Sequence, residues 1–165
     1  MLSATEMEEI RRTIEHAETS RSACIDAMRV VQRVHGYVSD EALRDLSTLL
    51  EMDTAELDST ATFYNLIYRK PVGEHVILLC DSVSCWIMGH DTIRQHLERR
   101  LGIAMGRTTA DNRYTLLTIP CLGACDRAPA MMIDETLYGP LSAEKIDEIL
   151  ATHGDASEGG PWNDR

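Results

Sequence analysis

Hydrophobic positions in residues 1–70 recur every three or four residues, as they do along one face of an α-helix. Gly36 is suited to end one such helix, because glycine readily adopts the left-handed conformation at a helix C-terminus. Ser39 and Asp53 are suited to begin two more, and Asp53 with Glu56 forms a capping-box pattern. We therefore expect a bundle of three or four helices over residues 1–70. Its expected buried positions are Cys24, Ala27, Met28, Val30, Val31, Val34, Leu43, Leu46, Leu49, Leu50, Leu57, Ala61 and Tyr64.

The pattern changes after Pro71 and Gly73. Residues 76–80 are continuously apolar, which predicts a strand buried on both faces. A helix with Ile93, Leu97 and Leu101 on one face follows and ends at Gly102. Further strands are predicted at 108–109, 114–119, 131–133 and 136–138, before a last helix capped by Ser142. This order predicts an open α/β sheet of thioredoxin-like type over residues 71–153, so the fold class is mixed α and β. Residues 154–165 are rich in glycine and acid, and we expect them to form a disordered tail.

Composition excludes two classes of function. The chain has 27 acidic and 16 basic residues and a formal charge of −11, which argues against binding nucleic acid phosphates. Its longest apolar run is far shorter than the roughly 20 residues that span a bilayer, so we expect no membrane insertion. The N-terminal residues lack the apolar segment of a secretory signal, which favours the cytoplasm. In that reducing compartment, clustered cysteines more often bind metal or do redox chemistry than form disulfides.

Four of the five cysteines form two pairs on separate loops. Cys80 and Cys85 have four residues between them, and Cys121 and Cys125 have three. Each pair follows the end of a predicted strand, which aims the thiolates at a fixed point. Four thiolates are the ligand set of a [2Fe–2S] cluster and also of structural zinc, so this spacing leaves both alternatives open.

The loop residues favour iron–sulfur over zinc. Gly123, between Leu122 and Ala124, is able to take a positive φ and bring backbone N–H groups near sulfur. Cys85 is expected close to the first turn of the following helix, where N–H groups favour negative charge. Both features tune a reduction potential, which a zinc site does not need. A thioredoxin-type dithiol pair fits poorly, because such pairs have two intervening residues and Asp81 opposes a thiolate at Cys80.

The remaining candidate ligands have simpler interpretations. Cys24 lies on the apolar face of a predicted helix and is expected in the core. The six histidines are expected at the surface or at helix ends rather than at a metal, so a Rieske-type centre is not expected. They are His16, His35, His75, His90, His96 and His153.

Several separate stretches, in order along nearly the whole chain, resemble the E subunit of bacterial NADH:quinone oxidoreductase, respiratory complex I. They are residues 61–64 (ATFY), 71–76 (PVGEHV), 80–85 (CDSVSC), 108–111 (TTAD), 121–125 (CLGAC) and 128–129 (AP). The resemblance implies a helical bundle followed by a thioredoxin-like [2Fe–2S] ferredoxin domain. The family's four ligands correspond to Cys80, Cys85, Cys121 and Cys125, and we expect Gly123, Ser84 and Leu122 beside them.

The resemblance also implies a role and a partner. In this family the cluster exchanges one electron with the FMN of the neighbouring NADH-binding subunit, within the peripheral arm of a membrane-associated complex on the cytoplasmic side. FMN and NAD are bound by that partner, and this chain lacks a glycine-rich dinucleotide-binding motif. The isolated chain is therefore not expected to be catalytic. Related domains occur in NAD-dependent formate dehydrogenases and hydrogenases, which remain alternatives, as does a structural zinc module.

Overall fold

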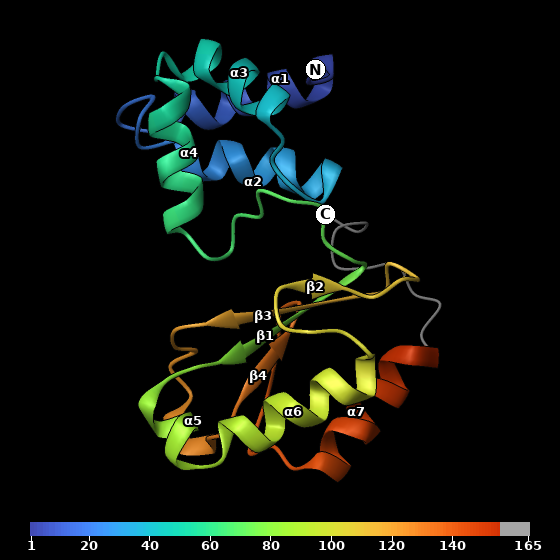
Figure 1. Ribbon diagram of the computed structural model, residues 1–165. Coiled ribbons are helices and arrows are strands. Elements are labelled where there is room, and N and C mark those ends of the chain that lie inside the picture. The colour runs from blue at the N-terminus through green and yellow to red at the C-terminus, as the bar shows by residue number, and fades with distance from the viewer. Residues whose placement is uncertain (156–165) are drawn as a thin grey trace. The chain divides into compact units, whose positions relative to one another are not determined.

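A computed structural model describes residues 1–155, in which the chain divides into two compact units, Met1–Pro71 and Val72–Arg165 (Figure 1). The tail expected over residues 154–165 lies outside the described residues, apart from Gly154 and Asp155, which end the last helix. No helix in the described part of the chain is both long and apolar enough to span a membrane.

The first unit is a four-helix arrangement of α1 (Ala4–Glu15), α2 (Cys24–His35), α3 (Asp40–Leu50) and α4 (Thr54–Phe63). Its core joins side chains from all four helices, and the largest that are fully buried are Ile10, Met28, Leu46, Leu50 and Leu57. Cys24 is buried in this core, as expected. Two expected core positions are wrong. Val34, in the last turn of α2, is 57% exposed, and Tyr64 lies just beyond α4 and is exposed, so both helices bury less than the pattern predicted.

Capping residues fix where these helices begin and end. Gly36 ends α2 with a φ of 76°, and Ser39 begins α3 by accepting a hydrogen bond from the Ala42 N–H. Asp53 caps α4 through the Ala55 N–H. The predicted capping box is not formed, because the carboxylate of Glu56 pairs with Arg21 instead. The helix boundaries were therefore predictable, while the partner of Glu56 depended on tertiary structure.

The second unit contains a five-stranded sheet with strand order β2-β3-β1-β4-β5. The strands are β1 (His75–Cys80), β2 (Arg107–Thr108), β3 (Tyr114–Ile119), β4 (Met131–Ile133) and β5 (Thr136–Tyr138). Two helices, α5 (Val83–Ile87) and α6 (His90–Leu101), connect β1 to the hairpin of β2 and β3, and α7 (Ala143–Asp155) ends the unit. All predicted strands and helices are present. The short α5, which the sequence pattern did not indicate, is added between Cys80 and α6.

Strand β1 is the centre of this sheet, and every one of its residues is buried. It runs parallel to β3, with His75 opposite Tyr114 and Cys80 opposite Ile119, and antiparallel to β4. Because parallel neighbours need a crossover, α5 and α6 carry the chain back between them. Helices α6 and α7 lie next to each other in the second unit (Figure 1). Their side chains, including Ile93, Leu97 and Ile146, form one core with those of the strands.

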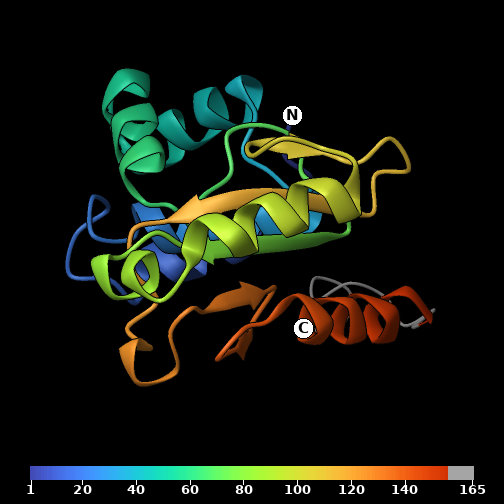
Figure 2. The ribbon, with the colours of Figure 1, turned by 60° about the horizontal axis from the view of Figure 1, so that its bottom comes forward.

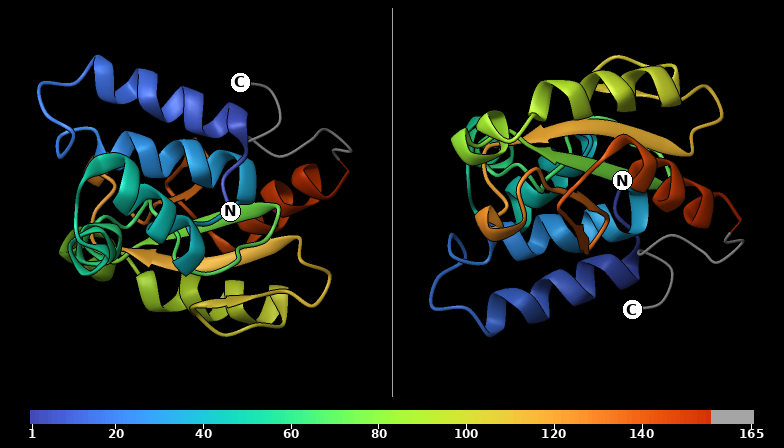
Figure 3. Two further views of the ribbon diagram at one scale, coloured as in Figure 1. Left: turned by 90° about the horizontal axis from the view of Figure 1, so that it is seen from above. Right: turned by 90° about the horizontal axis from the view of Figure 1, so that it is seen from below.

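Parallel pairing also brings two loops to one end of the sheet. The chain leaves β1 at Cys80 and β3 at Ile119, which are register partners. Figures 2 and 3 show α5 and the segment after β3 side by side at that end. Both predicted cysteine loops therefore lie at the same end of the sheet.

Two histidines, His75 and His90, are buried and not at the surface, although His90 does lie at a helix end as the first residue of α6. His75 Nδ1 lies 2.7 Å from Asp134 Oδ2, and Asp134 Oδ1 accepts a hydrogen bond of 2.9 Å from the Val76 N–H. Asp134, in the turn between β4 and β5, therefore provides hydrogen-bond partners for polar groups of the first two residues of β1. The sequence did not reveal this, because the two segments are far apart along the chain.

Glu6 makes the stability of the helical unit depend on pH. Burial raises the pKa of its carboxyl group, but hydrogen bonds with Ser3 and His35 outweigh burial, so the pKa is lowered. Such a group stabilises the folded state above its unfolded-state pKa, and this stabilisation is lost as pH falls through the folded-state pKa. We expect Glu6→Gln to reduce the free energy of unfolding by about 1–2 kcal/mol at neutral pH. The reduction should become progressively smaller as the pH falls below about 4.3 and through the lower folded-state pKa. Urea unfolding followed by circular dichroism at neutral pH and across the acidic range measures this.

The matched control is Glu8→Gln in the same helix, because Glu8 is exposed and forms a surface ion pair with Arg12. It is expected to change stability by less than about 0.5 kcal/mol. A penalty for Glu6→Gln that stays the same at acidic pH contradicts the assignment.

Candidate metal centre

The first two candidate ligands are buried at the end of β1. Cys80 is the last residue of β1 and is 2% exposed, while Cys85 lies in the first turn of α5 and is 1% exposed. Both side chains belong to the same small buried cluster. The expectation that Cys85 lies near a helix start is confirmed, although the helix is the short α5 rather than α6.

Ser82 links these two cysteines. Its hydroxyl accepts a hydrogen bond from the Cys85 N–H at 3.4 Å, which caps α5, and it lies 3.4 Å from the Cys80 sulfur. Ser84, which was expected beside the ligands, is half-buried, and its carbonyl accepts a hydrogen bond from the Met88 N–H. A serine two residues after a strand and three before the next cysteine is an N-cap pattern, and this signal was available in the sequence.

The two buried thiols differ in acidity. Burial alone raises the pKa of Cys80, but hydrogen bonds from the Ser82 hydroxyl and the Leu122 backbone outweigh it, so the pKa is lowered. Burial raises the pKa of Cys85, and the neighbouring Cys80 raises it further. Of the two thiols, Cys80 therefore loses its proton at the lower pH. This matters for metal binding, because the ligand is the thiolate.

The other two candidate ligands are exposed on the loop after β3. Gly123 has a φ of 71°, as predicted, and its N–H donates to the Cys121 sulfur at 3.3 Å. Cys125 opens a single 3₁₀ turn, Cys125–Arg127, which leads to a cis bond between Ala128 and Pro129. The predicted placement of backbone donors near sulfur is thus present in this loop.

This second loop packs on the first cysteine pair. Cys80 and Cys85 form a small buried cluster with Ala124, Ala128 and Ala130, and Leu122 packs against it. In the described part of the chain, no three or more histidine, cysteine or acidic side chains converge closely enough to hold a metal ion. The structure therefore brings the two loops together and pairs Cys80 with Cys85, while Cys121 and Cys125 are exposed.

The donor chemistry of these loops fits an iron–sulfur cluster. All four cysteines are free thiols, two of them lie in an apolar environment, and the Gly123 N–H donates to the Cys121 sulfur. Thiolate ligands with N–H donors and limited solvent access are the features that set a cluster potential.

One buried residue beside the loops was missed. Both ring nitrogens of His90 lie in the interior and lack hydrogen-bond partners among the residues that the structure describes. The nearest carboxylate oxygens belong to Asp91, at 3.5 Å from Nδ1, and to Asp81, at 3.8 Å from Nε2. Its position as first residue of α6, after the positive φ of Gly89, suggested a helix end and gave no sign of burial.

Comparison with known proteins shows which family this chain belongs to. Residues 10–153 match the family described as thioredoxin-like [2Fe-2S] ferredoxin. The E subunit of NADH-quinone oxidoreductase from Escherichia coli K12 is 45% identical over 149 residues, which cover 90% of each chain. The same protein of Pseudomonas aeruginosa is 40% identical over 153 residues, covering 93% of this chain and 92% of the relative.

A solved structure shows the same fold in another enzyme. A chain of an NAD+-reducing [NiFe]-hydrogenase in the air-oxidized state aligns with a TM-score of 0.65 and 27% identity. The alignment covers 77% of this chain but 22% of the hydrogenase chain, so the similarity concerns one part of that larger protein. Both the mixed α and β fold and the family resemblance are confirmed. The chain belongs to the thioredoxin-like [2Fe–2S] ferredoxin family, among the members that form the E subunit of NADH-quinone oxidoreductase.

Proposed function

We propose that this chain binds one [2Fe–2S] cluster through Cys80, Cys85, Cys121 and Cys125 and exchanges one electron with FMN in a neighbouring NADH-binding subunit. The observation that carries the proposal is the packing of Leu122 and Ala124 on the buried Cys80–Cys85 pair. This packing holds the loop that bears Cys121 and Cys125 against the other two thiols. Ligation by all four requires the exposed pair to turn inward.

The polypeptide's part in this function is to hold and tune the thiolates. The cluster, when bound, supplies a site that accepts and releases one electron. The Leu122 backbone and the Ser82 hydroxyl hydrogen-bond to Cys80, and the Gly123 N–H hydrogen-bonds to Cys121. Such donors stabilise negative charge on sulfur and therefore favour the reduced state.

The surface next to Cys85 supports docking of a redox partner. Residues 82–89 carry no formal charge in a chain of which 26% is charged. Within this stretch Trp86 is 63% and Ile87 71% exposed, and Val83 and Met88 are also exposed. Exposed apolar clusters of this kind mark interaction sites, and tryptophan is enriched among residues that dominate binding energy. We propose that this α5 surface, defined as Val83, Trp86, Ile87 and Met88, contacts the subunit that binds FMN and NAD.

The family membership supports a location as well. The relatives are named as subunits of a quinone-reducing complex, which supports a place for this chain in the peripheral arm of such a complex, on the cytoplasmic side of the inner membrane. In this proposal the chain takes part in NADH oxidation as a subunit and is not catalytic alone.

A second candidate assembly is supported by the solved structures. The similarity to part of an NAD+-reducing hydrogenase chain favours the same electron-transfer role in a hydrogenase or a related formate dehydrogenase. Co-purification from the native host distinguishes these assemblies, because each would bring a different catalytic subunit with this chain.

Removal of any proposed ligand is expected to destroy the cluster. The purified chain should contain two iron and two sulfide per molecule, as the [2Fe–2S] formula requires, and should give an EPR signal after reduction. Cys80→Ala, Cys85→Ala, Cys121→Ala and Cys125→Ala should each lower the iron and sulfide content at least about fivefold, because a missing thiolate leaves one iron incompletely ligated. Anaerobic absorption, EPR and metal analysis on the same samples measure this.

The control for this series is Cys24→Ala, because Cys24 is buried in the helical unit and lies outside the cysteine loops. It should retain the full cluster. A colourless chain with zinc and without sulfide supports the structural zinc module instead, and full cluster content in Cys121→Ala refutes the ligand set.

The α5 surface is expected to matter for assembly and not for the cluster. The double variant Trp86→Ser and Ile87→Ser should weaken binding to the FMN-containing subunit at least about tenfold, since each side chain offers a large apolar area. Iron content should remain unchanged. Binding is measured by co-purification and by titration with the isolated partner.

Leu137→Ser is the matched control in the same unit, because Leu137 is also an exposed large apolar residue but lies on β5. It should bind the partner normally. Equal affinity for the wild type and the double variant contradicts the proposed docking surface.

A further inference from the structure

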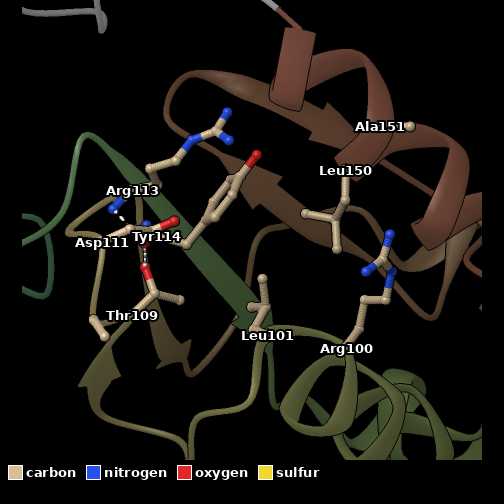
Figure 4. A pocket seen from close by; sticks show the side chains of 9 residues that line it. Arg100, Leu101, Thr109, Asp111, Arg113, Tyr114, Leu150 and Ala151 are labelled. Atoms are coloured by element: carbon tan, nitrogen blue, oxygen red, sulfur yellow. Dashed lines mark hydrogen bonds between the residues drawn. The ribbon is translucent and has the colours of Figure 1, made fainter.

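A pocket lies in the second unit at the end of the sheet opposite the cysteine loops. It is formed by the end of α6, the turn of the β2–β3 hairpin and the C-terminal half of α7, and its volume is about 600 Å³ (Figure 4). This lies within the range of roughly 300–1,000 Å³ that is usual for small-molecule sites. Tyr114 lines the pocket at the start of β3, whereas Cys80 pairs with the last residue of β3, about 17 Å away by strand length.

The Tyr114 side chain provides an unpaired polar group. Tyr114 is 7% exposed, and its hydroxyl oxygen is buried and has no hydrogen-bond partner among the described residues. Nearly all buried polar groups in proteins are hydrogen-bonded, and an exception calls for an explanation. A ligand with an acceptor atom at this position would satisfy the phenol O–H.

Two arginines flank this tyrosine. The Arg113 guanidinium lies 5.6 Å from the centre of the Tyr114 ring and donates to the His153 carbonyl, which holds it in place. Arg100 stands at the other side of the opening, where its Nε donates to Asp147 at 3.1 Å (Figure 4). Leu101 and Leu150 supply apolar surface between them. The pocket thus combines cationic groups at its edges with an apolar interior.

Nearby carboxylates limit the charge that the pocket accepts. Asp111 also lines it, but accepts hydrogen bonds from the Thr109 hydroxyl and the Arg113 N–H, which lower its pKa and keep it negative. Asp147 offsets part of the charge of Arg100. Glu74 and Asp134 add negative charge near Tyr114. This excess of carboxylates favours a singly charged anion over a doubly charged phosphate.

We propose that this pocket binds a small organic carboxylate with an apolar body. The carboxylate accepts hydrogen bonds from Arg113 and the Tyr114 hydroxyl, and the apolar body lies against Leu101 and Leu150. Figure 4 shows the phenol oxygen and the Arg113 guanidinium on the same side of the pocket, which allows one carboxylate to contact both. The site uses none of the cysteine loops and does not depend on the proposed cluster.

Amide NMR on the purified full chain tests the proposal, with hexanoate as probe and 1-hexanol as its uncharged counterpart. Hexanoate should cause saturable shifts at millimolar concentration, confined to the amides of Leu101, residues 109–114 and residues 150–151. Hexanol and inorganic phosphate, at matched ionic strength, should each bind at least tenfold more weakly. Comparison with hexanol isolates the contribution of the carboxylate.

Variants separate the two proposed contacts. Arg113→Gln should weaken hexanoate binding at least tenfold. Tyr114→Phe should weaken it at least threefold without lowering the melting temperature, because the hydroxyl has no partner to lose among the described residues. Arg99→Gln is the control, since Arg99 lies on α6 outside this pocket and should bind hexanoate like the wild type.

The proposal would be overturned by equal shifts with hexanol and hexanoate, or by shifts spread over the whole unit. Unchanged hexanoate affinity in Tyr114→Phe, which is expected to fold normally, would also overturn it. A requirement for both arginines and a preference for phosphate would likewise reject the carboxylate assignment.

Discussion

The parallel pairing of β1 with β3 is the constraint on which the rest of the second unit depends. It places Cys80 opposite Ile119, so that both strands deliver their following loops to one edge of the sheet. The same register places His75 opposite Tyr114 at the other edge. Because β1 is buried throughout, a shift by one residue would exchange its two faces and disrupt this arrangement. The register thus places the cysteine loops and the proposed carboxylate pocket at opposite ends of the sheet.

Most of the fold could be predicted from local signals. Helix ends followed from residues such as Gly36, Ser39 and Gly102, whose conformational and capping preferences act over a few residues. The strands followed from changes in hydrophobic period. Failures occurred where the outcome depended on distant segments: Glu56 pairs with Arg21 instead of capping its own helix, and His75 is buried because Asp134 approaches it. The short α5 was missed because five residues carry too little periodicity.

The sequence predicted the backbone conformation of the second cysteine loop but not the relative positions of the four sulfur atoms. The positive φ of Gly123 and its N–H near sulfur followed from the small residues between Cys121 and Cys125. The residues expected beside the ligands did not include Ser82, although it caps α5 and lies next to the Cys80 sulfur. The burial of His90 was not indicated by the residues around it in the sequence. How four sulfur atoms converge cannot be deduced from spacing, because it depends on rotamers in two loops that only tertiary packing brings together.

The uncharged α5 surface has a consequence for the chain before it joins a complex. A free molecule displays Trp86 and Ile87 to every other copy, and such exposed groups promote aggregation. The formal charge of −11 opposes this, because like-charged molecules repel one another in solution. Repulsion weakens as salt rises, since screening shortens its range. The acidic composition therefore opposes association of copies through the exposed α5 surface.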